Sequence, residues 1–294
     1  MFRAARLQLR MLVRSRENRA ARNEDSRMTR LPRWLIEAVA MVGLLLGVQA
    51  QTTRAQQTET KKSGPAPRRD MSGIWEVENT IEGISPAGVH SHAPFTAWGA
   101  NVANNVYKPG DGPRKVPIGN VNDPLDGCDP AGFPRDLLFE FRPFQVVQTA
   151  NQVLMMYQYQ RVWRVIWTDG RALPKDPDPR WYGYSIGKWE DDQTFVVQTS
   201  GLDERTWLDN AGDPHSSEMR VEERYHRVDH DTLEITVKID DPKTYTAAWL
   251  ARDKLRLKLL PANTDLMEMI CAPSEAEEYK KVIANPATGP TPSK

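Results

Sequence analysis

Hydrophobic and polar residues alternate along much of the second half of the chain. Between residues 219 and 228 the alternation places Met219, Val221, Glu223, Tyr225 and Arg227 on one face, with charged residues opposite. A period of two predicts β-strands that bury one face. The predicted strands are residues 73–78, 144–149, 153–160, 162–168, 185–190, 194–199, 219–228, 233–240, 254–260 and 266–271.

Short polar turns join several of these segments, for example at residues 150–151, 191–192 and 229–231. Neighbouring strands joined in this way form an antiparallel meander. We therefore predict an all-β fold: an antiparallel up-and-down barrel of about 8–10 strands, with a β-sandwich as the alternative. The barrel is favoured because closure removes exposed strand edges.

One short helix is predicted near the C-terminal end. Pro273 precedes Ser274, a suitable N-cap, and Glu277 stands at the third helical position, which is a capping-box arrangement. We expect this helix to end near Ala284 and to pack on the outside of the sheet. Residues 79–136 are irregular and rich in Gly, Pro and Asn. A stretch of this length is often functional, and we expect it to cover one barrel mouth.

The N-terminal region has the features of an export signal. Residues 35–48 are apolar, but the run is shorter than the ~20 residues that span a membrane. Arg30 and Arg33 precede it, and cleavage is expected after Ala50 or Ala55. Counted from Met28 the signal has an ordinary length; an Arg-rich organelle transit peptide is the alternative. Sequencing the N-terminus of the secreted protein decides between them.

These features predict the organisation of the chain and its location. Residues 1–50 are assigned to an N-terminal extension and signal peptide, 51–70 to a disordered linker, 71–284 to the barrel domain and 285–294 to a disordered tail. The predicted location is secreted or periplasmic. No stable membrane span is expected once the signal is cleaved.

The charge of the expected mature part argues against nucleic acid as a partner. Ten of the 39 basic residues, but only four of the 39 acidic residues, lie in the first fifty positions. The remainder is therefore mildly acidic, whereas proteins that bind nucleic acid carry basic surfaces. The sequence does not determine the oligomeric state.

Two cysteines, Cys128 and Cys271, are the only ones in the chain. In an oxidising compartment such a pair often forms a disulfide. That bond would tie the segment before the central strands to the end of the last predicted strand. Two small buried thiols are the alternative.

Seven short motifs together resemble a large family of exported, mostly uncharacterised bacterial proteins. The resemblance covers residues 71–284 and implies a secreted, β-rich domain, without implying a particular reaction. The motifs are SGIW at 72–75, CDPAGFPR at 128–135, WRVIWTDGR at 163–171, GYSIGKWE at 183–190, PHS at 214–216, ERY at 223–225 and CAPSE at 271–275.

A second similarity is to lipocalin-like barrels, whose first strand opens with Gly-x-Trp, as Gly73 and Trp75 do here. This similarity implies that Trp75 closes one end of the barrel. It also suggests that Arg256 lies over the Trp75 ring as a cation–π partner.

Two inward-facing charges are the first candidates for chemistry. Glu223 lies on the apolar face of its strand, where a carboxylate is costly unless it is paired. Arg164 shares a face with Ile166, so it points inward if Ile166 does. An internal Arg164–Glu223 ion pair is the favoured interpretation. The alternatives are an acid–base role for Glu223 and binding of a ligand carboxylate by Arg164.

A loop before the strand at 219–228 supplies further candidates. It carries His215, a residue type that can shuttle protons near neutral pH, together with Trp207 and Asp209. His215 and Glu223 are the candidate catalytic residues. Aromatic residues gather in the middle of the chain and suit an apolar, ring-containing ligand or a sugar; packing in the core and at the rim is the alternative. The candidate ligand-binding residues are Arg164, Arg171, Trp207, Asp209 and Tyr184.

Cofactor motifs are missing from the sequence. It contains no P-loop and no Gly-x-Gly-x-x-Gly, and the Gly-x-Ser-x-Gly match at residues 183–187 runs into the predicted strand 185–190, so it is not a strand-to-helix elbow. His90 and His92 lack a third ligand at a telling spacing, so neither a metal nor another cofactor is expected.

Three functions remain open. The favoured one is a secreted barrel that binds a small hydrophobic or aromatic ligand. The second is a barrel hydrolase, lyase or isomerase that uses His215 and Glu223 as an acid–base pair. The third is a structural or interaction module of the cell envelope.

Overall fold

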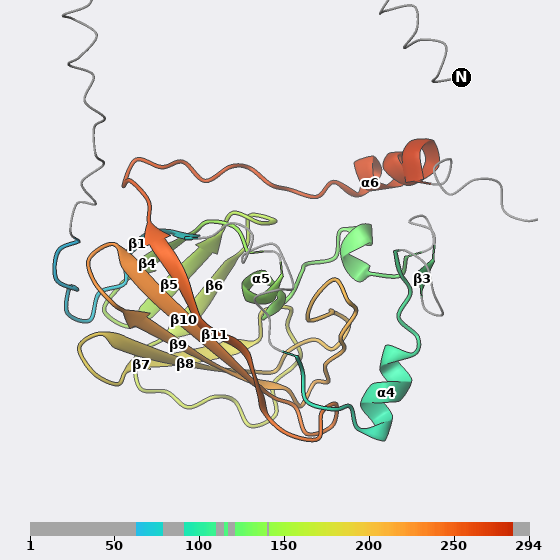
Figure 1. Ribbon diagram of the computed structural model, residues 1–294, viewed down its shortest axis with the longest axis horizontal. Helices are drawn as coiled ribbons and strands as arrows, with labels where there is room; N and C mark the ends of the chain where they lie inside the picture. The colour runs from blue at the N-terminus through green and yellow to red at the C-terminus, as the bar shows by residue number, and fades with distance from the viewer. Residues whose placement is uncertain (1–62, 79–90, 110–114, 117–120, 140, 285–294) are drawn as a thin grey trace, which may run out of the picture. The chain divides into compact units, whose positions relative to one another are not determined.

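The computed structural model describes residues 63–78, 91–109, 115–116, 121–139 and 141–284, and its main feature is a closed β-barrel (Figure 1). Nine strands form the barrel in the order β1-β11-β10-β9-β8-β7-β6-β5-β4. The strands are β1 (Gly73–Val77), β4 (Phe144–Gln148), β5 (Gln152–Tyr157), β6 (Trp163–Trp167), β7 (Tyr184–Trp189), β8 (Thr194–Ser200), β9 (Arg220–Arg227), β10 (Thr232–Asp240) and β11 (Trp249–Leu259).

The predicted barrel is confirmed, but it is not antiparallel throughout. Strands β6 and β7 are parallel, and they pair only at Ile166 with Ser185 and at Trp167 with Ile186. A closed ring can alternate strand direction everywhere only if the number of strands is even. With nine strands, at least one neighbouring pair must be parallel. The connection between the two strands, residues 168–183, therefore returns from one end of the barrel to the other.

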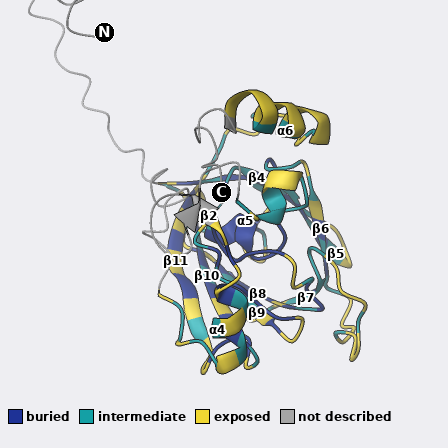
Figure 2. Ribbon diagram, turned by 90° about the vertical axis from the view of Figure 1, so that its right-hand side faces the viewer, coloured by how far each residue is buried: buried dark blue, intermediate teal, exposed yellow. Residues whose placement is uncertain are grey.

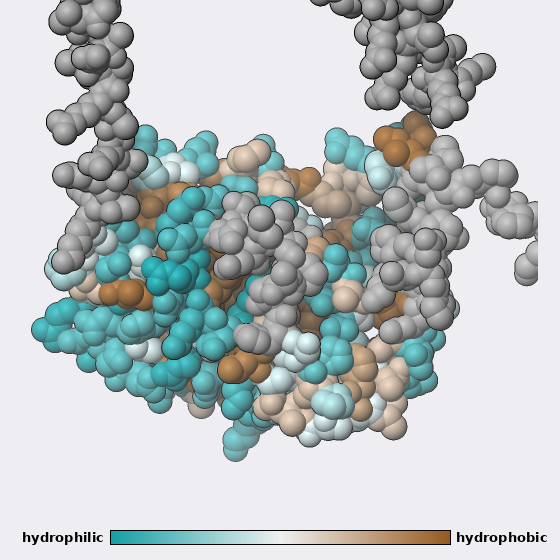
Figure 3. All heavy atoms as spheres, in the orientation of Figure 1, coloured by the Kyte–Doolittle hydropathy of each residue, from teal (hydrophilic) through white to brown (hydrophobic). Residues whose placement is uncertain are grey.

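Alternating burial on β9 and β10 confirms the predicted faces. On β9 the buried residues are Val221, Glu223, Tyr225 and Arg227, and the residues between them are more exposed. Strand β10 follows the same rule from Leu233 to Ile239. Figure 2 shows this alternation of buried and exposed positions, and Figure 3 shows hydrophilic residues over β10 and β11 on the face turned to the viewer.

The inward side chains form one hydrophobic core. It includes Trp75, Phe144, Met155, Ile166 and Phe195, each with at most 1% of its surface exposed. Residues before β4 add to this core. Helix α5 (Arg135–Leu138) is buried along its whole length, and Arg252 of β11 donates to the carbonyls of Leu137 and Leu138. This segment thus extends into the barrel interior, which side chains occupy.

Other short elements accompany α5 in the irregular region. They are α4 (Ala97–Ala103), β2 (Lys108–Pro109), β3 (Lys115–Val116) and the 3-10 helix η3 (Pro124–Gly127). Arg135 forms a buried bidentate pair with Asp123, which precedes η3, at 2.9 and 2.7 Å. The ion pair fixes η3 to the start of α5. Residues 79–90, including His90, lie outside the described part.

The C-terminal segment differs from its prediction in two ways. Residues 266–271 do not form a strand, although Met269 makes one isolated bridge to Tyr159. The helix is present as α6 (Pro273–Tyr279), followed by the π-helix η4 (Lys280–Ala284), but Ala272 is its N-cap and no side chain caps it. Pro273 occupies the first helical turn instead of preceding the helix. Helix α6 contacts η3 and, contrary to the prediction, buries no residue against the sheet.

Cys128 and Cys271 form the predicted disulfide. Cys128 ends η3 and Cys271 lies just before α6. The bond therefore joins two segments outside the barrel strands and holds α6 beside η3.

Residues 63–70, placed in the linker by the sequence, contact two barrel turns. Ser63 donates a hydrogen bond to Asp229 at 2.8 Å, and Arg68 pairs with Asp192 at 2.7 Å. Residues 1–62 and 285–294, which hold the expected signal and the expected tail, lie outside the described residues.

Trp75 is fully buried, and an arginine covers its ring, but not the one predicted. The guanidinium of Arg227 lies 4.6 Å from the ring centroid, and the indole N–H donates to the carbonyl of Met71. Arg256 instead pairs with Glu78 and Glu234 on the outer surface. Arg227 points inward from β9 whereas Arg256 points outward from β11, so only Arg227 can reach the interior ring.

Candidate functional site

The barrel interior contains a polar cluster built on Arg164. Its guanidinium forms a bidentate ion pair with Glu223, at 2.8 and 2.6 Å. It also donates to the hydroxyls of Ser185 and Thr199, at 2.9 and 2.6 Å. The Phe133 ring centroid lies 3.8 Å from the guanidinium carbon. The predicted internal pair is confirmed, and we call these residues the interior cluster.

Neighbouring tyrosines complete the interior cluster. The Tyr225 hydroxyl donates a hydrogen bond of 2.6 Å to Oε2 of Glu223, an oxygen that also accepts from Arg164. Burial, followed by the charge of Glu223, raises the pKa of Tyr225 well above its ordinary value. Burial likewise raises the pKa of Tyr157. Both phenols therefore stay protonated and can donate hydrogen bonds at every physiological pH.

The charges of the ion pair stabilise one another. Burial alone would lower the pKa of Arg164, but the charge and hydrogen bonds of Glu223 outweigh burial and raise it. Both side chains are almost completely shielded from solvent, at 1% and 0% exposure. Four hydrogen bonds already engage the guanidinium. The geometry therefore makes Arg164 a structural residue of the interior and does not leave it open to a ligand carboxylate.

His215 is buried at a different place. Its Nε2 and the Thr206 hydroxyl share a hydrogen bond of 2.8 Å, and its Nδ1 lies 3.2 Å from the Ser216 carbonyl. Burial lowers the pKa of His215. Asp241 fixes this region by accepting bonds from the Ser216 amide and hydroxyl, both at 2.7 Å. Asp241, directly after β10, therefore orders this loop through its hydrogen bonds.

The two candidate catalytic residues therefore belong to separate clusters. Within the described residues, no hydrogen-bonding partner of His215 is also a partner of Glu223. Both His215 and Glu223 are buried, and neighbouring protein groups already form hydrogen bonds with each side chain. A His–Glu acid–base pair is consequently not the function that this geometry supports best.

Trp207 and Asp209 have local structural roles in the same loop. Both are 7% exposed. Asp209 accepts bonds from the amides of Ala211 and Asp213, at 2.8 and 3.2 Å, and so shapes the turn. The Trp207 ring lies 5.9 Å from the guanidinium carbon of Arg135. Neither residue lines the clefts described next.

An open cleft lies where β6 and β7 separate. It has a volume of about 460 Å³, within the range of small-molecule sites. The outward side chains of β6 line it, and Trp163 is 69% exposed, the largest exposed fraction of any described large hydrophobic side chain. We call it the aromatic cleft; its lining residues are Trp163, Arg164, Val165, Trp167, Pro179, Arg180, Trp181, Tyr182, Gly183, Tyr184 and Ser185.

The parallel pairing creates this cleft. Because β6 and β7 share only two register pairs, the first half of β6 pairs with β5 on one edge but not with β7 on the other, and residues 179–183 line the cleft on that side. Backbone hydrogen bonds hold that connection in place. The Arg180 amide donates to the Gly201 carbonyl at 3.0 Å, and the Arg180 carbonyl accepts from the amides of Gly183 and Asp203 at 3.1 and 3.0 Å. The cleft wall is therefore anchored although it belongs to no strand.

Three of the five predicted ligand-binding residues gather around the aromatic cleft. Arg164 and Tyr184 line it, and the guanidinium of Arg171 lies 3.6 Å from the ring centroid of Trp167, another lining residue. Two further arginines cover lining rings: Arg180 lies over Tyr184 at 4.1 Å, and Arg205 over Trp181 at 4.2 Å. Burial, followed by the charge of Asp136, raises the pKa of the lining phenol Tyr182.

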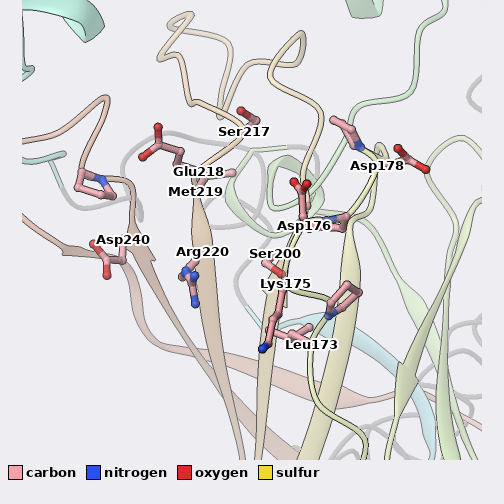
Figure 4. Close-up of a pocket in the computed structure, with 15 residues that line it drawn as sticks. Leu173, Lys175, Asp176, Asp178, Ser200, Ser217, Glu218, Met219, Arg220 and Asp240 are labelled. Atoms are coloured by element: carbon pink, nitrogen blue, oxygen red, sulfur yellow. The ribbon is translucent and has the colours of Figure 1, made fainter.

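A second cleft, of about 840 Å³, lies between the connection at residues 173–179 and the ends of β9 and β10 (Figure 4). Figure 4 shows Arg220 and Asp240 on the strands, with Lys175 and Asp176 across from them. None of its described lining residues is aromatic, and their charges are of both signs. It contains none of the predicted site residues. This charged cleft points to no single class of ligand.

Sequence reasoning missed Arg180. The signal was present in the stretch Pro177-Asp178-Pro179-Arg180-Trp181, where prolines predict an exposed, stiff connection and an arginine adjoins the aromatic run. The described residues contain no group of three or more His, Cys, Asp or Glu side chains placed to hold a metal ion. Among the same residues, no helix is both long enough and apolar enough to cross a bilayer.

Comparisons of the chain with protein-family models, with curated proteins and with solved structures found no match.

Proposed function

We propose that this protein is an exported β-barrel that binds a small planar, aromatic or hydrophobic molecule in the aromatic cleft. The observation that carries the proposal is a group of four aromatic rings around a volume of about 460 Å³: the exposed Trp163 and the half-buried Trp167, Trp181 and Tyr184. Rings of this kind bind planar ligands by stacking. The ligand sits on the outer wall of the barrel, because side chains occupy the interior.

Their position around one concave surface supports a binding role for these rings. An isolated exposed tryptophan needs no explanation, but several aromatic side chains around one concave surface are typical of ligand sites. Trp163 has no packing role that would account for its position, since 69% of its surface is exposed. The anchored connection at residues 179–183 provides a fixed second wall, which lowers the conformational cost of binding.

The disulfide supports the location outside the cytoplasm. Disulfides persist in oxidising compartments and are rare in the cytosol. The bond between Cys128 and Cys271 agrees with the export signal expected at residues 28–50. Export also suits a binding protein that collects its ligand from the surroundings of the cell.

The test is a calorimetric titration of the purified protein with 2-naphthamide, a neutral planar probe. We expect saturable binding, and we expect Trp163→Ala to weaken it about two- to tenfold, which corresponds to the loss of one aromatic stacking contact. Because Trp163 is mostly exposed, its replacement should change the free energy of unfolding by less than about 0.5 kcal/mol.

Tyr279→Ala is the matched control. Tyr279 is also an exposed aromatic residue, at 47%, but it lies on α6, away from the cleft lining. We expect this variant to bind the probe like the unmodified protein. If no saturable binding occurs, or if Trp163→Ala and Tyr279→Ala behave alike, the binding proposal is wrong and a structural role in the envelope becomes the better interpretation.

A further inference from the structure

We infer that the ligand of the aromatic cleft carries a carboxylate, and that Arg180 is the residue that selects it. This inference rests on the proposed function, because it names the chemical class of the molecule bound there. It starts from the three arginines that lie over lining rings: Arg171, Arg180 and Arg205. All three stack on an aromatic ring, but only two of them are neutralised.

Arg171 and Arg205 each hold their own carboxylate. Arg171 binds Asp169 through three hydrogen bonds of 2.6 to 3.0 Å. Arg205 binds Asp203 in the same way, at 2.7 to 3.2 Å. In both pairs the carboxylate stands two residues before the arginine, so each loop supplies its own counter-charge.

Arg180 lacks such a partner among the described residues. Asp178 occupies the equivalent position two residues earlier, yet no carboxylate oxygen of the described part lies within 4.0 Å of the Arg180 guanidinium. The side chain is exposed and lies 4.1 Å from the Tyr184 ring centroid. Its backbone is held by Gly201, Gly183 and Asp203. The guanidinium is thus positioned at the cleft with its N–H groups available.

The rest of the cleft carries no competing negative charge. None of its lining residues is an aspartate or glutamate. The other lining arginine, Arg164, is already neutralised by Glu223 inside the barrel. A planar ligand stacked on the tryptophans would therefore meet one available cation, and a guanidinium binds a carboxylate through two parallel hydrogen bonds.

The test compares 2-naphthoate with its neutral isostere 2-naphthamide, by calorimetry at low salt on the purified protein. We expect the acid to bind about fivefold more tightly than the amide, a modest ratio because the pair is exposed. Arg180→Gln should remove this preference by weakening acid binding, while the affinity for the amide stays within about twofold.

The control removes an exposed arginine that lies outside the aromatic cleft. Arg220→Gln, on β9, changes the net charge of the protein by the same amount as Arg180→Gln and should keep the acid preference. If the amide binds but the acid binds no more tightly, or if Arg180→Gln keeps the preference, the inference about Arg180 is overturned while the binding proposal stands. If neither probe binds, the proposed function fails and the inference fails with it.

Discussion

Arg164 and Arg180 have the same side chain in similar contacts but different surroundings. Each guanidinium lies on an aromatic ring, 3.8 Å from the centroid of Phe133 and 4.1 Å from that of Tyr184 respectively. Arg164 is buried and makes four hydrogen bonds to Glu223, Ser185 and Thr199. Arg180 is exposed and has no carboxylate partner in the described residues.

The difference shows how burial decides what an arginine can do. A buried guanidinium must have its donors satisfied inside the protein, because an unpaired buried charge is very costly. Once satisfied, it has nothing left to offer a ligand. An exposed guanidinium can remain available, because water solvates it in the absence of a ligand. We therefore expect the interior cluster to contribute to stability, and we place the proposed ligand recognition in the aromatic cleft.

The largest expected effect comes from removing Glu223. Glu223→Ala leaves the Arg164 charge buried without its partner and should lower the free energy of unfolding by about 3–5 kcal/mol. The measurement is the urea midpoint at pH 7. Glu222→Ala is the control on the outer face of the same strand, where its only ion pair with a described residue is a 4.0 Å contact with Arg224. It should change stability by less than about 0.5 kcal/mol.

Replacing both members of the ion pair sharpens the same comparison. Arg164→Met combined with Glu223→Met removes both charges, and buried pairs replaced by apolar residues are often neutral in stability. The double variant should therefore be more stable than Glu223→Ala and should still bind the naphthalene probes. A stably folded double variant that has lost binding would assign recognition to the interior after all.

A smaller effect is expected from His215 as the pH falls. Burial holds its folded-state pKa below the ordinary value of 6.5, so the unfolded chain binds the proton first. The contribution of neutral His215 is fully present above about pH 6.5 and is lost as the pH falls towards the folded-state pKa, by at most about 1.4 kcal/mol per pH unit.

Urea midpoints between pH 7.5 and 5 measure this dependence. His215→Gln should flatten the decline relative to the unmodified protein. Equal slopes for the unmodified protein and His215→Gln would show that His215 is not the group that takes up the proton.

Local patterns in the sequence were sufficient for the parts of the barrel with regular alternation. Strands β9 and β10 alternate without interruption, so the inward position of Glu223 followed directly. Arg164 followed in the same way from its shared face with Ile166. Strand β11 was predicted too short because its register with β10 shifts near Arg252 and Lys254 has a positive φ of 54°, which interrupts the alternation.

Features that depend on distant pairing were not predictable. No local pattern specifies that β6 and β7 run parallel across the connection at residues 168–183, and the aromatic cleft follows from that pairing. The strand predicted at residues 266–271 is absent for a related reason. Strand β1 pairs with both β4 and β11, so the closed barrel leaves no free edge beside β11 for another strand.

The most direct test of the account locates the ligand among the tryptophans. Nuclear magnetic resonance of the indole N–H groups, assigned with single Trp→Phe variants, would be recorded during a titration with 2-naphthoate. We predict that the signals of Trp163 and Trp167 shift, because both residues line the aromatic cleft. The signal of Trp75 should stay unchanged, because Trp75 is fully buried and its indole N–H is hydrogen-bonded to the carbonyl of Met71. A shift at Trp75 without shifts at Trp163 and Trp167 would contradict binding on the outer wall.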